Sequence, residues 1–86
     1  MDTATKQSLD EFISYLAKEF AHHKHFSHIE VGNWHLKDFK VTVDIFDHGD
    51  RKPIYFDVRE IKENRERFNH LLDNAFEQVR SNQTTY

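Results

Sequence analysis

The residues with the clearest chemical potential lie in one segment, His22-His23-Lys24-His25-Phe26-Ser27-His28, which holds four histidines within seven positions. Neutral imidazoles are common metal ligands, so His22 together with His25 or His28 could approach one ion. The segment contains no carboxylate, however, and Lys24 adds a repelling positive charge. We therefore interpret it as a solvated helix end, where basic side chains complement the helix dipole. We expect no metal and no cofactor, and a weak zinc or nickel site is the alternative.

A second group of polar residues crowds one turn between two apolar runs, and its members are Asp44, Asp47, His48 and Asp50. A calcium loop of the EF-hand type needs oxygen ligands at alternating positions and a late glutamate. This spacing does not supply them. We interpret the group as a polar turn in which the aspartates cap their own backbone.

A third pattern combines Asp44 and Asp57 with the sequence Glu60-Ile61-Lys62. It resembles the PD-(D/E)xK nuclease family, which has an α-β-β-β-α core, carboxylates that hold Mg²⁺ and a lysine that polarises water. The resemblance implies that these four charged residues converge. Strand periodicity disfavours this, because Asp44 points outward whereas Glu60 is in phase with the inward Val58. We expect a protein that is not an enzyme, with a metal-dependent nuclease as the alternative.

Hydrophobic periodicity predicts two helices that would hold these groups. The first covers 8–23, with Ser8 and Glu11 as a capping box, and the second covers 63–81. Each has one apolar face. Their apolar residues are Leu9, Phe12, Ile13, Leu16 and Phe20 in the first helix and Phe68, Leu71, Leu72, Ala75, Phe76 and Val79 in the second.

Alternation of apolar and polar residues predicts strands at 39–46 and 54–60, with Phe39, Val41, Val43 and Ile45 inward in the first. Residues 47–52 would form the turn of an antiparallel hairpin. The pairs Val41–Val58, Val43–Phe56 and Ile45–Ile54 then place six apolar side chains on one face. The apolar pattern of residues 29–36 predicts a third strand, with either a β-bulge or a tight turn at Gly32-Asn33.

These elements predict one α+β domain over residues 1–86, ending in a polar tail at 82–86. A three-stranded antiparallel sheet would carry the N- and C-terminal helices on one face, because neither helix has another place to bury its apolar side. The order is α-β-β-β-α.

Composition narrows the functional classes. The 86 residues include no cysteine, which excludes disulfides and thiolate metal sites. No apolar run approaches the roughly 18 residues of a membrane span, and Met1–Lys6 lacks the pattern of a signal peptide, so we expect a cytoplasmic protein. The net charge is −3, with both signs interleaved. We therefore do not expect direct nucleic-acid binding, which relies on a basic face.

The outer face of the predicted sheet is the remaining candidate for a site. Aromatic residues beside arginine are typical of binding hot spots, and Phe46 and Tyr55 would point outward here. The predicted binding residues are Phe46, Tyr55, Asp57 and Arg59 on this face, with Asp44, Asp47 and Asp50 beside them. The sequence thus favours a non-catalytic protein-binding module, and a structural homo-oligomeric accessory protein, such as a homodimer, is a further alternative.

In size, mild acidity, lack of cysteine and element order, the chain resembles small phage-encoded proteins that inhibit host machinery, such as anti-CRISPR inhibitors with an α-β-β-β-α core. The resemblance implies a host enzyme as the partner, occluded by the bound protein. It also implies that Asp44, Asp47, Asp50 and Asp57 stand in for phosphates.

Overall fold

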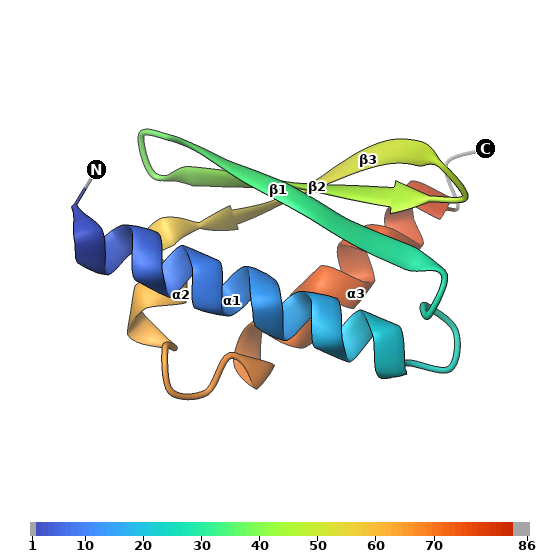
Figure 1. The fold of residues 1–86 in the computed structure, drawn as a ribbon, viewed down its shortest axis with the longest axis horizontal. Coiled ribbons are helices and arrows are strands. Elements are labelled where there is room, and N and C mark those ends of the chain that lie inside the picture. Colours follow the sequence, from blue (N-terminus) through green and yellow to red (C-terminus); the bar gives the residue numbers. More distant parts are fainter. Residues whose placement is uncertain (1, 84–86) are drawn as a thin grey trace.

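The computed structural model describes residues 2–83 and has the predicted α+β architecture. The strands form an antiparallel sheet in the order β1-β2-β3, and the helices lie along one side of it (Figure 1). The elements are α1 (Thr3–His22), β1 (Ile29–Lys37), β2 (Lys40–Asp47), β3 (Asp50–Asp57), α2 (Val58–Glu63) and α3 (Asn69–Gln83).

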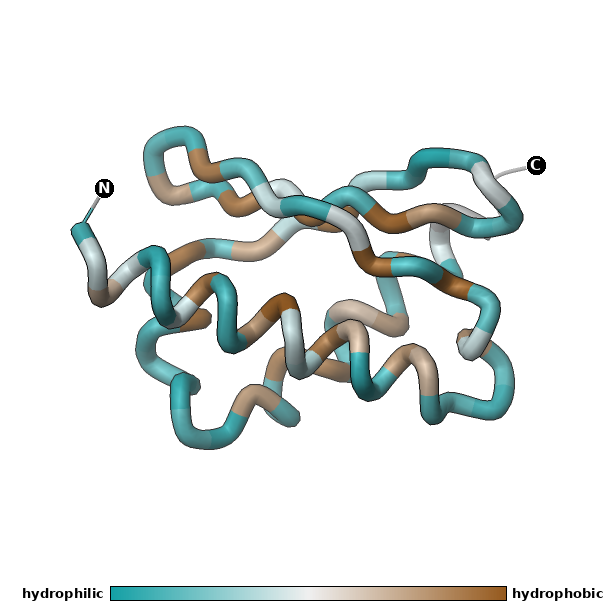
Figure 2. The backbone as a smooth tube through the Cα atoms, in the orientation of Figure 1, coloured by the Kyte–Doolittle hydropathy of each residue, from teal (hydrophilic) through white to brown (hydrophobic). Residues whose placement is uncertain are grey.

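The core lies between the sheet and the helices. Apolar and polar positions alternate along the strands and recur with the turns of α1 (Figure 2), and this pattern buries one side of each element. Phe12 of α1 is central. The centroid of its ring lies 4.9 Å from that of Phe56 and 5.2 Å from that of Phe68, and both pairs are edge-on. A further aromatic group joins the end of α1 to α3 through Phe20, Phe26 and Phe76.

The first helix begins earlier than predicted. Asp2 is its N-cap, and its Oδ1 accepts a hydrogen bond from the Thr5 backbone N at 2.6 Å. Ser8 is buried in the second turn, so the predicted capping box of Ser8 and Glu11 is wrong. Glu11 instead pairs with Arg65, 3.1 Å away, which ties α1 to the segment after α2.

The third strand begins and ends earlier than the predicted 54–60, and the single helix predicted at 63–81 is two helices. The chain leaves the sheet at Asp57, whose Oδ1 accepts from the Arg59 backbone N at 2.8 Å and caps α2. Residues 58–60 are therefore helical. After a short connection, α3 continues to Gln83, so the first two residues of the predicted tail are helical, and 84–86 lie outside the described residues.

The β2–β3 hairpin has the predicted faces but not the predicted pairing. Val41 pairs with Phe56 and Val43 with Ile54, two residues away from the predicted partners, and Ile45 lies opposite Lys52. The strands continue to Asp47 and Asp50, so the turn contains two residues rather than six. A shift of two residues keeps each side chain on its face, so five of the six predicted inward side chains still face inward. The sixth, Val58, is buried at the start of α2.

The bulge in β1 is confirmed. The pairing of β1 with β2 shifts by one residue between Val31 and Trp34, so both side chains reach the core side. Phe39 differs from its prediction: it lies in the turn between β1 and β2 and is exposed. Two-residue turns project their side chains away from the sheet, so the alternation that predicted an inward Phe39 ends at Lys40.

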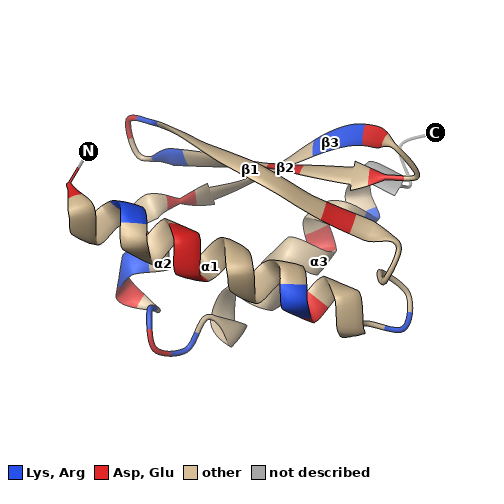
Figure 3. Ribbon diagram, in the orientation of Figure 1, with Lys and Arg blue, Asp and Glu red and all other residues tan. Residues whose placement is uncertain are grey.

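The described residues carry charges of both signs along every layer, as Figure 3 shows for the helices and the sheet. None of the helices within 2–83 combines the length and apolar character that crossing a bilayer requires.

Candidate functional site

Asp44 lies in the middle of the outer sheet face and is held by both neighbouring strands. Arg51 of β3 places Nη2 2.7 Å from Oδ1, and His35 of β1 places Nε2 3.2 Å from Oδ2. Burial raises the pKa of Asp44, but the bonds from Arg51 and His35 outweigh it and lower the pKa below its usual value. The carboxylate therefore ties three strands together.

Phe46 packs against the neighbouring strand. It is half-buried and covers the bulge in β1, where a Cβ atom on Gly32 would lie 2.9 Å from its Cε2. The close approach of ring and backbone explains a glycine at this point of the bulge. The role of Phe46 as a binding anchor stays a prediction.

The two aspartates of the hairpin turn differ from each other. Asp50 is exposed at the start of β3. Asp47 is in phase with the inward Ile45 and is only 6 % exposed, with Lys52 Nζ 3.6 Å from its Oδ2. The sequence placed both at a solvated tip, and the two-residue turn instead keeps Asp47 inside the strand.

Exposed aromatic rings gather at the opposite end of the sheet. Phe39 is 56 % exposed and Tyr55 43 % exposed. The Arg59 guanidinium lies over the Phe39 ring at 4.2 Å, and Lys40 Nζ lies over the Tyr55 ring at 4.3 Å. We call Phe39, Lys40, Tyr55, Asp57 and Arg59 the aromatic patch; the sequence identified three of these five residues.

Asp57 fixes the guanidinium of the aromatic patch. Arg59 donates from Nε to Oδ1 at 2.9 Å and from Nη2 to Oδ2 at 2.6 Å. These bonds, followed by the bond from the Arg59 backbone N, lower the pKa of Asp57 to about 2. A bidentate pair of this kind has a set orientation, so Arg59 is held in place over Phe39.

Two lysines lie at this end of the sheet. Lys37 and Lys40 are directly opposite each other across the β1–β2 turn, an arrangement in which like charges repel. Asp57 lies opposite Lys40 on β3, but among the described residues no carboxylate is within ion-pair distance of either lysine. Hollows of about 470 Å³ and 530 Å³ flank Phe39. Their charged lining residues are Lys37, Asp38, Lys40 and Asp57 in the first and Asp2, Asp38, Arg59 and Lys62 in the second.

The edge of β3 is partly closed by a side chain. Gln78 of α3 accepts from the Tyr55 backbone N and donates to the Tyr55 backbone O, both at 2.7 Å. One amide thus replaces the two bonds that a neighbouring strand would make. At Tyr55 the edge is unavailable for strand pairing.

The residues that the nuclease resemblance requires do not meet. In the sheet, Asp57 of β3 lies opposite Lys40 of β2. Lys40 is four residues from Asp44 along β2, so Asp57 and Asp44 are separated by about 13 Å at the rise of a strand. Lys62 donates to Thr5 Oγ1 of α1 at 3.3 Å, and Asp57 is occupied by Arg59. The four groups therefore form no common centre in this structure.

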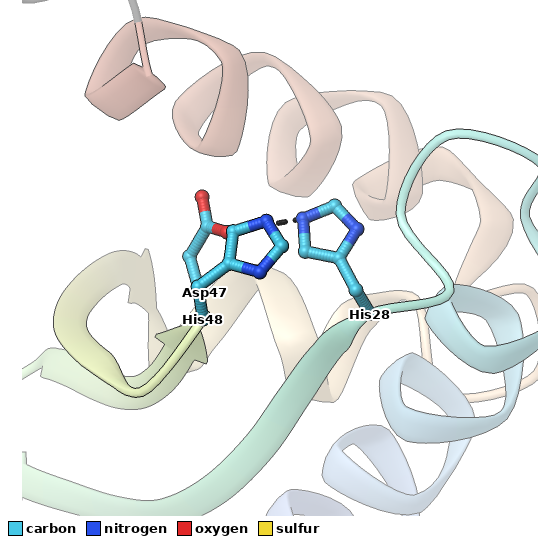
Figure 4. A group of neighbouring side chains, drawn as sticks. All are labelled: His28, Asp47 and His48. Atoms are coloured by element: carbon cyan, nitrogen blue, oxygen red, sulfur yellow. Dashed lines mark ion pairs between the residues drawn. The ribbon is translucent and has the colours of Figure 1, made fainter.

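The histidine segment divides into two parts. His22 is exposed at the end of α1. The ring of His23 packs against Phe26 and Phe76, with centroid distances of 4.8 Å and 4.5 Å. His28 lies apart from them and faces the β2–β3 turn. There it meets Asp47 and His48, and one potential ligand atom of each of the three residues lies within 4.8 Å of the others (Figure 4).

Comparison with known proteins adds no family to this description. No family model, curated protein or solved structure matches the chain.

Proposed function

We propose that this protein is a non-catalytic protein-binding module that uses the aromatic patch as its contact surface. The observation that supports this is the position of the exposed rings. Phe39 and Tyr55 are the large apolar side chains that the described residues leave exposed, and both lie in the aromatic patch.

Physical arguments favour a protein partner at this surface. An exposed ring gains free energy when a partner covers it, at about 25 cal/mol for each Å² of apolar area removed from water. Aromatic rings lose little side-chain entropy on binding, which makes them frequent hot spots. Each ring here already carries a cation on one face, so the contact surface is preorganised.

The charges around Phe39 define the chemistry of the partner. Lys37 and Lys40 face each other, and no carboxylate of the described residues is within ion-pair distance of them, so an acidic partner segment would relieve their repulsion. The hollows beside Phe39 offer space for an apolar side chain from the same segment. We therefore propose a partner that presents an apolar residue flanked by carboxylates.

The resemblance to phage-encoded inhibitors extends this proposal to a host enzyme that the bound protein occludes. The mode differs from the one that the resemblance implied. Of the four aspartates expected to imitate phosphates, Asp44, Asp47 and Asp57 have cations of this chain at 2.6–3.6 Å. Their charge is already compensated, so the lysines beside Phe39 are the better candidates for recognition.

The test compares two variants of the aromatic patch with a matched control. Lys40→Glu and the double variant Phe39→Ser with Tyr55→Ser should weaken binding of the partner at least tenfold, or about 1.4 kcal/mol. Lys24→Glu makes the same charge reversal at an exposed residue near the end of α1 and should bind as the wild type does. Circular dichroism establishes that each variant is folded.

The partner is first identified by affinity purification from the native host, and its dissociation constant is then measured with purified components. If the aromatic-patch variants bind as tightly as Lys24→Glu, the aromatic patch is not the contact surface. If sedimentation shows that the wild type self-associates and that the same variants abolish this, the partner is a second copy of the chain.

A nuclease assay separates this proposal from the catalytic alternative. We expect no cleavage of DNA or RNA with Mg²⁺ or Mn²⁺. Cleavage that Glu60→Ala abolishes would favour a nuclease over a binding module.

A further inference from the structure

The contact of His28 with the β2–β3 turn brings together the ligand types of a transition-metal site. His28 Nε2 lies 3.0 Å from Asp47 Oδ1, and His48 Nε2 lies 3.6 Å from the same oxygen. The two imidazole rings stack with their centroids 4.5 Å apart. Figure 4 shows His28 where the chain enters β1 and His48 beside it in the β2–β3 turn.

These distances suit a bound ion. In a tetrahedral zinc site with ligands at about 2.0–2.2 Å, neighbouring ligand atoms are roughly 3.4 Å apart. The two nitrogen–oxygen distances of 3.0 Å and 3.6 Å lie on either side of this value. His48 is 78 % exposed, so its ring is free to turn away from the stack and direct a nitrogen to the ion.

The donor set selects the class of metal. Two imidazoles with one carboxylate favour first-row transition metals, whereas Mg²⁺ and Ca²⁺ prefer oxygen ligands. Three protein ligands leave a coordination position open. The expectation of no metal site rested on the lack of a carboxylate within residues 22–28, and the tertiary structure supplies that carboxylate from Asp47.

The backbone of the turn holds His48 in a left-handed conformation. His48 and Gly49 have φ angles of 54° and 88°, as the two central residues of a tight hairpin turn require. Asparagine is the common residue at the first of these positions, and histidine is among the residues that also adopt this region. Replacement of His48 by asparagine therefore changes the potential ligand and keeps the backbone of the turn.

Lys52 is a cation that approaches the same carboxylate. Its Nζ is 3.6 Å from Asp47 Oδ2, on the other oxygen from the one that both imidazoles approach. Oδ1 can therefore bind a metal while Lys52 stays on Oδ2.

We propose that His28, Asp47 and His48 form a surface site for a divalent transition metal, and that the bound ion is Zn²⁺. The exposure of His48 sets the expected affinity in the micromolar range. Binding would fasten the segment before β1 to the end of the β2–β3 hairpin, because His28 directly precedes β1, Asp47 ends β2 and His48 lies in the turn.

The experiment titrates Zn²⁺ into metal-free protein that carries no histidine tag, with isothermal calorimetry as the readout. We expect one ion per chain. The melting temperature at a hundredfold excess of Zn²⁺ over the dissociation constant should rise by at least about 5 °C, and Mg²⁺ at the same concentration should leave it unchanged.

Substitutions then locate the ion. His48→Asn keeps a residue suited to the left-handed turn and should weaken Zn²⁺ binding at least tenfold. His28→Gln should do the same. The matched controls, His22→Gln and His25→Gln, change the same residue type outside the trio and should leave the affinity within twofold.

Two results would overturn the proposal. One is Zn²⁺ affinity that is unchanged in both His48→Asn and His28→Gln, with folded spectra for the two variants. The other is affinity that falls only in His22→Gln or His25→Gln, which would place the ion at the end of α1 instead.

Discussion

Truncation of Phe12 should destabilise the fold far more than truncation of Phe39, and the comparison tests the division into core and binding surface. Phe12 has no exposed surface, and its ring contacts Phe56 and Phe68. Phe→Ala in a core costs about 3–5 kcal/mol. Two edge-on ring pairs, at about 0.5–1.5 kcal/mol each, place Phe12→Ala near the upper end of that range.

The same change at Phe39 removes little. The side chain is more than half exposed, and the main partner of its ring is the Arg59 guanidinium. A cation over an exposed ring stabilises by about 0.5–1 kcal/mol. A chain of 86 residues has a total stability of about 4–13 kcal/mol. Phe12→Ala would therefore consume a third of it or more, while Phe39→Ala leaves the protein folded.

Urea denaturation followed by circular dichroism measures both variants. The midpoint of Phe12→Ala should fall strongly and its melting temperature by at least about 12 °C, with the midpoint of Phe39→Ala close to that of the wild type. Equal destabilisation of the two variants would show that Phe39 belongs to the core and would remove the main support for the aromatic patch.

Three further predictions concern the sheet. Gln78→Ala should cost about 0.5–1.5 kcal/mol for each hydrogen bond that it removes and should speed hydrogen exchange of the Tyr55 amide. Gly32→Ala should cost about 1–3 kcal/mol by overpacking, and a double-mutant cycle with Phe46→Ala should recover part of this stability. The low pKa of Asp57, about 2 against 3.8, contributes stability above pH 3.8 that is lost as the pH falls towards 2; Asp57→Asn should flatten this part of the melting-temperature profile.

The apolar spacing of the sequence determined the fold class and the inward faces. Leu9, Phe12, Leu16 and Phe20 could bury one side only as a helix, and Val41, Val43 and Ile45 could do so only as a strand. The bulge at Gly32-Asn33 was also predictable, because Ile29 and Val31 are out of phase with Trp34 and Leu36. These predictions depend on local periodicity, which the sequence contains in full.

The sequence predicted the pairing of the strands and the ends of the helices and strands less well. Periodicity of two fixes the face of a side chain but leaves its partner open to shifts of two residues, so the length of the turn had to decide the register. His48-Gly49 is an uncommon form of the two-residue turn, and it was hidden among other polar residues. At the end of β3, Asp57 followed by Glu60 is a capping pattern that could have indicated the start of α2.

The candidate sites depended on the tertiary structure. Each ring of the aromatic patch is paired with a cation from another element or from a neighbouring strand, and no local pattern encodes that meeting. The contact of His28 with Asp47 follows from the bulge, which sets Ile29 opposite Asp47; continued without the bulge, the register would place Glu30 there. Residues far apart in the chain thus become neighbours through one inserted residue, whose effect on pairing only the folded sheet reveals.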